Sequence, residues 1–171
     1  MDDSNRITKL LPFSLTAFVI VLDQISKTLI RLHLPIGERI ELLGDLLWLW
    51  HVRNRGMAFS MGSTLPGGTR DILFLLLPAA VLLLLLLYYF RSKELGSIQR
   101  WCFTAILGGG VGNLLDRLLR PEGVIDFISV KFYGLFGLER YPTFNLADST
   151  VVIAGLIMIV SYLTDQKRSV A

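Results

Sequence analysis

Apolar residues along the chain are concentrated in four long blocks that polar segments separate. A transmembrane helix needs about 20 consecutive, mostly apolar residues, and each block approaches or reaches that length. The pattern predicts an all-α membrane protein in which residues 1–171 form a single membrane domain with four transmembrane helices. The predicted spans cover residues 10–32, 71–90, 98–118 and 145–163.

The connection over residues 33–69 has a different pattern. Apolar and polar positions alternate on both sides of Gly44-Asp45, which is typical of a β-hairpin. We therefore predict a small extracytoplasmic β-sheet subdomain, with its Trp and Leu side against lipid or substrate. A folded cap without substrate contact is the alternative. Residues 119–144 are expected to form an extracytoplasmic loop.

Composition supports a membrane protein. Hydrophobic residues make up 53% of the chain, the mean hydropathy is +0.57 and the net charge is only +3. The basic residues lie at the edges of the apolar blocks, which favours membrane flanks over nucleic-acid binding. The single cysteine, Cys102, excludes an internal disulfide. The two histidines form no ligand motif, so neither a metal nor a cofactor is expected.

The distribution of Lys and Arg predicts the orientation. The N-terminus, the 91–100 loop and the C-terminal tail together are short and densely basic, whereas the two opposite connections are long and more sparsely charged. Both termini are therefore expected in the cytoplasm. A cleaved signal peptide is the alternative for the first block, but no small-residue cleavage site follows it.

Polar residues in the predicted spans and their connections converge on one depth, near the outer end of each helix. Asp23 and Lys27 are four residues apart and can pair on one helix face, as can Asn113 and Arg117. Ionisable groups inside membrane spans are costly and usually functional. The candidate residues are Asp23, Lys27, Asn54, Asn113, Asp116, Arg117, Asp126, Asn145 and Asp148.

Most of these candidates also have a purely structural interpretation. In this interpretation the Asp23–Lys27 pair merely stabilises the first helix, and Asn145 is simply the N-terminal cap of the fourth. Asp116-Arg117 would be an ordinary interfacial charge pair. The glycines of "LGGGVG" suit close helix contact. Ser60 and Ser63 lack a partnering base, which argues against a serine nucleophile.

Asp126 differs, because it lies between two apolar pairs in "VIDFI" and caps no apparent helix. An acid in apolar surroundings has a raised pKa, and a second acid close by would keep one proton on the pair. Asp148, at the same depth on the fourth helix, is the candidate partner. Such a dyad can deprotonate water with one carboxylate while the other donates a proton to a scissile carbonyl.

Five blocks of sequence, in order, carry a resemblance to a known family. They are "DQISK" at 23–27, "NRGMAFS" at 54–60, "GGGVGNLLDR" at 108–117, "VIDFI" at 124–128 and "FNLADS" at 144–149. The chain resembles the lipoprotein signal peptidases, the bacterial type II signal peptidases. No block departs from the family's pattern. The resemblance assigns no role to residues 129–143, between the last two blocks.

The resemblance implies an aspartic endopeptidase of the bacterial cytoplasmic (inner) membrane, with its active site at the outer leaflet. Its substrates would be diacylglyceryl-modified prolipoproteins, cut on the N-terminal side of the lipidated cysteine. Globomycin-like inhibitors would occupy the site, and a monomer would suffice. Asp126 and Asp148 would be catalytic, and the residues that line or support the site would be Asn54, Gly109, Asn113, Arg117, Asn145, Asp23, Lys27 and Asp116.

Two other functions are compatible with intramembrane carboxylates. A small proton- or ion-coupled carrier could use Asp23, Asp126 and Asp148 as relay groups, but the chain has no internal repeat and its acids lie at one edge. A non-catalytic membrane scaffold would leave Asp126 unexplained.

Overall fold

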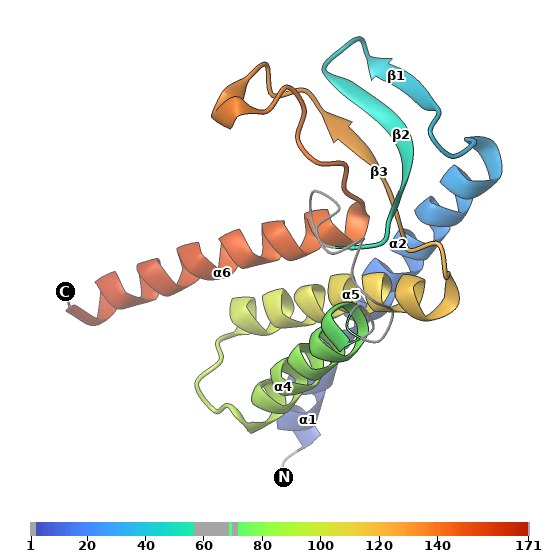
Figure 1. The fold of residues 1–171 in the computed structure, drawn as a ribbon. Helices are drawn as coiled ribbons and strands as arrows, with labels where there is room; N and C mark the ends of the chain where they lie inside the picture. Colours follow the sequence, from blue (N-terminus) through green and yellow to red (C-terminus); the bar gives the residue numbers. More distant parts are fainter. Residues whose placement is uncertain (1–2, 57–68, 70–71, 171) are drawn as a thin grey trace.

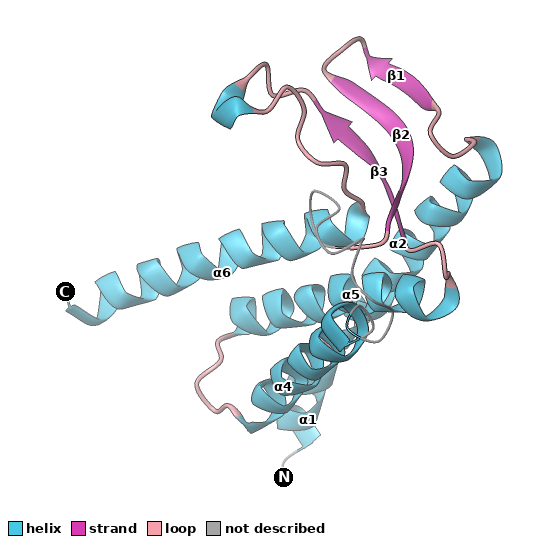
Figure 2. Ribbon diagram, viewed as in Figure 1, coloured by secondary structure: helices cyan, strands magenta, loops and turns pink. Residues whose placement is uncertain are grey.

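The structure, a computed structural model, describes residues 3–56, 69 and 72–170, and it is mostly helical with one small sheet (Figures 1 and 2). Part of the predicted β subdomain, both serines considered above and the start of the second predicted span lie outside the described residues. In chain order the elements are α1 (Asp3–Leu10), α2 (Phe13–His33), β1 (Arg39–Leu43), β2 (Leu47–Asn54), the π-helical turn η2 (Ile72–Leu76), α4 (Leu77–Arg91), α5 (Ser97–Leu119), β3 (Val124–Val130), the 3₁₀ turn η3 (Leu135–Gly137) and α6 (Leu146–Val170).

Three helical segments among the described residues are long and apolar enough to cross a membrane. They are Ile7–His33, Ile72–Arg91 and Leu146–Thr164, and they correspond to the first, second and fourth predicted spans. The third predicted span is α5, whose 23 residues suffice by length. Its composition does not qualify, because its glycines and the polar residues of its C-terminal half lower its hydropathy.

Helix α5 packs against α2, α4 and α6 (Figure 1). Two of its glycines make these contacts possible. A Cβ at Gly109 would lie 2.5 Å from the carbonyl oxygen of Ala147 in α6, and one at Gly112 would lie 2.7 Å from Oδ2 of Asp23 in α2. The prediction that the "LGGGVG" glycines permit close helix contact is therefore confirmed.

The sheet is antiparallel with the order β1-β2-β3. Strands β1 and β2 form the predicted hairpin around Gly44-Asp45. The expectation of a loop over residues 119–144 was wrong for its central part, because Val124–Val130 forms β3 and pairs with β2. The apolar residues around Asp126 are thus strand residues, and both Ile125 and Phe127 are buried against Ile30 of α2.

Arg140 holds the segment after β3 against the sheet. Its guanidinium donates to the hydroxyl and carbonyl oxygens of Ser129, at 2.9 and 3.0 Å, and to the carbonyl and Oδ1 of Asp45, at 2.9 and 3.2 Å. It also lies 3.4 Å from the ring centroid of Trp48, and Arg39 lies 3.7 Å from the same centroid. Two guanidinium groups this close to one ring must stack on opposite faces.

Replacing Arg140 should loosen residues 131–144 without disturbing the helices. Arg140→Met removes all four hydrogen bonds, which are charge-assisted and together worth roughly 1–3 kcal/mol net. Hydrogen–deuterium exchange at the amides of Tyr141 and Phe144, which donate to Val130 and Ile128, should accelerate. Arg39→Met is the matched control, because Arg39 stacks on the same ring, whereas its ion pair with Glu41 is exposed and contributes little. Equal exchange in both variants would contradict this role.

Candidate active site

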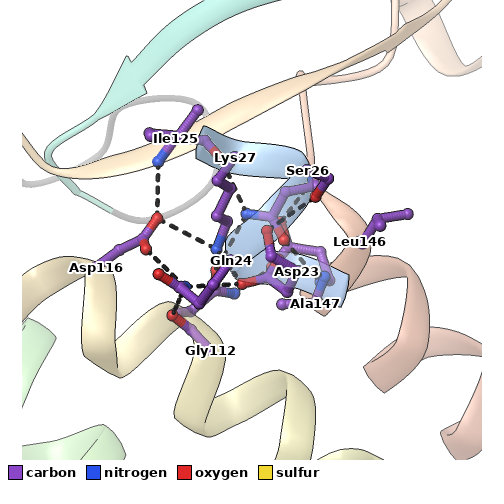
Figure 3. Close-up of polar contacts among 12 residues, drawn as sticks. Asp23, Gln24, Ser26, Lys27, Gly112, Asp116, Ile125, Leu146 and Ala147 are labelled. Carbon is purple, nitrogen blue, oxygen red and sulfur yellow. Dashed lines mark hydrogen bonds and ion pairs between the residues drawn. The ribbon is translucent and has the colours of Figure 1, made fainter. Parts of the chain in front are cut away.

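Lys27 of α2 lies at the centre of a buried polar network (Figure 3). Its side chain is fully buried, and its ammonium nitrogen lies 2.7 Å from Oδ2 of Asp23, 3.2 Å from Oδ2 of Asp116 and 2.9 Å from Oδ1 of Asn113. An ammonium group carries three N–H donors, so each donor has an acceptor. The two carboxylates compensate the buried charge, and the network joins α2 to α5.

The two carboxylates beside Lys27 also accept hydrogen bonds from other elements. Oδ1 of Asp23 accepts the backbone N–H of Ala147 at 3.1 Å, which ties the first turn of α6 to α2. Oδ2 of Asp116 accepts the backbone N–H of Ile125 at 3.1 Å, which ties β3 to α5. Asp23 and Asp116 thereby position the two elements that carry Asp148 and Asp126.

Two asparagines connect Lys27 to the proposed dyad. Asn113 accepts from Lys27 through Oδ1 and donates through Nδ2 to Oδ1 of Asp148 at 2.7 Å. Asn145 donates through Nδ2 to the same Asn113 oxygen at 3.0 Å and to Oδ1 of Asp126 at 2.7 Å. Because a lysine can only donate, the network allows one orientation of the Asn113 amide. The chain Asp126–Asn145–Asn113–Asp148 brings both carboxylates into one arrangement.

Asp126 is only 2% exposed, and both of its oxygens accept hydrogen bonds. The donor to Oδ2 is Nδ2 of Asn54, at 3.0 Å. Val52 faces Asp126 across the β2–β3 ladder, so Asn54 lies two residues further along β2 on the same face. Burial, and then the negative charge of Asp148, raise the pKa of Asp126 to about 7, although the hydrogen bonds from Asn54 and Asn145 oppose the rise.

Asp148 forms part of the N-terminal cap of α6. Its backbone N–H donates to Oδ1 of Asn145 at 3.0 Å, and its Oδ2 accepts the backbone N–H of Asn145 at 3.2 Å. This reciprocal arrangement is a capping box. The structural interpretation of Asn145 as a helix cap is therefore correct, but each side chain has a second bond toward Asn113 or Asp126.

Both carboxylates line one cavity of about 470 Å³ between the sheet, the C-terminal end of α5 and the N-terminal end of α6. Arg117 lines it too, as do Trp50, Val52 and Asn54 of β2 and residues 138 and 140–144. A cavity that combines two acids, a guanidinium and apolar walls suits a peptide substrate. Among the described residues, no cluster of His, Cys, Asp or Glu could hold a metal ion.

Two other candidates from the sequence, Asp116 and Gly109, lie away from the cavity or have other partners than expected. Asp116 pairs with Lys27 and Arg120, and the suggested charge pair with Arg117 does not form. Gly109 lies in the α5–α6 contact and not in the cavity.

Sequence reasoning missed Gln24 and the residues of the cavity wall. The Gln24 side chain donates to Asp23, to Asp116 and to the carbonyl of Gly112. As a polar residue in an apolar span, Gln24 carried the same signal as its neighbours. Residues 138 and 140–144 carried none, because their place in the cavity wall depends on tertiary contacts.

Comparison with known proteins decides the family. The model of the signal peptidase (SPase) II family matches residues 15–164. The chain belongs to the signal peptidase II family. A lipoprotein signal peptidase of Treponema denticola is 48% identical over 153 residues, which cover 90% of this chain and 88% of that protein. One from Treponema pallidum is 41% identical over 161 residues, covering 94% and 87%.

The fold is similar to that of two solved structures. One structure, described as a bacterial membrane enzyme, superposes with a TM-score of 0.78 at 26% sequence identity, covering 92% of this chain and 90% of the other. A second with the same description gives a TM-score of 0.76 at 25% identity, covering 91% and 94%.

The raised pKa of Asp126 should appear as pH-dependent stability. The folded protein binds the carboxyl proton more tightly than the unfolded chain, so this stabilisation is complete below pH 3.8 and disappears as pH rises to about 7. Over that interval the free energy of unfolding should fall by at most about 1.4 kcal/mol per pH unit from this group. In thermal unfolding measured in detergent, the stability of Asp126→Asn should decline less with rising pH than that of the unsubstituted protein. An identical decline would show that Asp126 does not titrate there.

Proposed function

We propose that the chain is an aspartic endopeptidase that removes signal peptides from diacylglyceryl-modified prolipoproteins, cutting on the N-terminal side of the lipidated cysteine. One observation carries the proposal: Asn113 and Asn145 join Asp126 and Asp148 at the wall of a single cavity. Membership of the signal peptidase II family supports it, as do the names of the matched relatives.

The two carboxyl groups differ in a way that suits acid–base catalysis. Asp126, with a pKa of about 7, holds a proton in a substantial fraction of molecules near neutral pH and donates it to the scissile carbonyl oxygen. Asp148, whose oxygens accept N–H donors from Asn113 and Asn145, removes a proton from the attacking water. The tetrahedral intermediate then collapses as the C–N bond breaks: Asp148 gives the proton that it took from water to the leaving amine, and Asp126 takes back the proton from the hydroxyl of the intermediate.

The supporting residues have separate tasks. Asn54, Asn113 and Asn145 hold the carboxyl groups, and Arg117 lies in the cavity wall, where its guanidinium can bind substrate carbonyl oxygens. Asp23, Lys27 and Asp116 fix α2, α5, β3 and α6 relative to one another, and Gly109 allows α6 to approach α5. None of this second group needs to touch substrate.

The proposed membrane topology counts α5 as a fourth span beside the three long apolar segments. We propose that four helices cross the bacterial inner membrane, with both termini in the cytoplasm and the sheet at the outer leaflet. The chain then forms a single membrane domain, and the cavity opens where a lipidated cysteine resides. Both carboxylates come from one chain, so a monomer is sufficient, and globomycin-like inhibitors would occupy the cavity. The matched relatives give no support to a carrier.

Removing either carboxylate should abolish cleavage. Asp126→Asn and Asp148→Asn should each lower kcat for a lipidated precursor by at least roughly 10²-fold, since each removes one acid–base group. Glu41→Gln is the control, because Glu41 lies exposed on β1, where it forms an exposed ion pair with Arg39. Release of signal peptide is measured by gel shift with purified protein in lipid. Full activity in either Asp variant, with normal folding, would refute the dyad.

Removing the hydrogen bond from Asn54 should move the alkaline limb of the pH–rate profile. That bond favours the charged form of Asp126 and lowers its pKa, so Asn54→Ala should raise the pKa further. The alkaline limb of kcat/KM, which we assign to loss of the Asp126 proton, should then shift to higher pH.

Thr143→Ala is the control for this shift, because Thr143 lines the cavity without a bond to either carboxylate. In Thr143→Ala the alkaline limb of kcat/KM should stay at the same pH, even if KM changes. If Asn54→Ala leaves the alkaline limb of kcat/KM at the same pH, the limb reports the titration of a group other than Asp126.

A further inference from the structure

A turn between β3 and α6 exposes large apolar side chains. The backbone N–H of Phe132 donates to Glu139, and that of Gly134 donates to Leu138, so the segment folds back on itself. At its tip, Tyr133 is 67% exposed, Leu135 is 56% exposed and Phe136 is 84% exposed. Tyr133 and Phe136 also have positive φ angles of 51° and 55°, which cost energy in side-chain-bearing residues. The sequence thus keeps aromatic residues at a strained and exposed turn.

The base of this turn lies beside α6. The part of α6 that it faces belongs to the segment that is long and apolar enough to span a membrane. Phe132, Tyr141 and Phe144 line a cavity of about 380 Å³ together with Val152 and Ile153 of α6. Val152 is six residues past the start of α6, about 9 Å along the helix axis at 1.5 Å per residue. In Figure 1 the turn, drawn in orange, projects beyond the sheet on the side where α6 lies.

We propose that residues 133–137 (the tip) insert into the outer leaflet of the bilayer, with lipid as their partner. The inference rests on the topology proposed above, in which the start of α6 marks the outer boundary. Continuity of apolar surface supports lipid as the partner, because Val152 and Ile153, beside the cavity at the base of the turn, are themselves exposed on α6.

Charge at the base of the tip also fits a lipid surface. Lys131 and Arg140 form the bridge that closes the turn, and the Lys131 ammonium lies 5.1 Å from the Tyr133 ring centroid. Aromatic residues at headgroup level with basic residues beside them are typical of interfacial anchors. The tip continues into residues 140–144, so the bilayer would help to hold this wall of the active-site cavity.

Spin labels can measure the depth of the tip in the intact protein. In a Cys102→Ala background, the full chain carries one label at Phe136→Cys and is reconstituted into phosphatidylglycerol–phosphatidylethanolamine vesicles. Collision with lipid-soluble oxygen is compared with collision with a water-soluble nickel chelate. Leu156→Cys, on the exposed face of α6, is the lipid reference, and Glu122→Cys, exposed after α5, is the aqueous reference.

The expected oxygen-to-nickel ratio at position 136 is several-fold above that at 122 and close to that at 156. A ratio at 136 equal to that at 122 would overturn the inference and leave the proposed function intact. Low collision with both reagents that depends on the protein-to-lipid ratio would show that a second copy covers the tip, and would also overturn it. An aqueous ratio at 156 would overturn the topology and the inference together, whereas cleavage of precursor tests the catalytic proposal separately.

Discussion

The buried ammonium of Lys27 is the constraint on which the placement of β3 and α6 depends. A charge removed from water must be compensated and fully hydrogen-bonded, and Asp23, Asp116 and Asn113 supply the three acceptors. The same two carboxylates receive the backbone N–H groups of Ala147 and Ile125, so the ion network sets where α6 and β3 begin. Loss of one partner would leave uncompensated charge and would displace the elements that carry Asp126 and Asp148.

The site uses stabilising and destabilising interactions side by side. Asn145 and Asp148 satisfy each other as a helix cap, which stabilises the fold, and they also bond to Asp126 and Asn113 respectively. Asp126 works in the opposite sense, because burial beside Asp148 makes its ionisation costly and raises its pKa to about 7. Two carboxyl groups in one cavity thus acquire different surroundings, which suits the separate acid and base roles proposed for them.

The sheet contributes the wall that the helices cannot provide. Asn54 on β2 reaches Asp126 on β3 because the antiparallel register places them on one face. Arg140, bonded to Ser129 and Asp45 and stacked on Trp48, then holds residues 140–144 over the cavity. With the tip in the outer leaflet, the substrate's lipid and the wall of its binding site would share one environment.

The pattern of apolar and polar positions determined the four long helices, the β1–β2 hairpin and the common level at which the polar residues gather, because each depends on local pattern and on the cost of polar groups in lipid. The cost of polar groups in apolar spans, together with the family resemblance, pointed to the residues of the network but not to Gln24. Tertiary structure alone decided that residues 124–130 form a strand. This strand pairs with β2 and is buried against α2, so its residues are apolar on both faces, and such a short apolar run has no period that distinguishes a strand from a helix. Tertiary structure likewise decided that Asp116 pairs with Lys27 and not with Arg117, and that residues 140–144 face the cavity. Those partners are far apart along the chain, and only packing can bring them together.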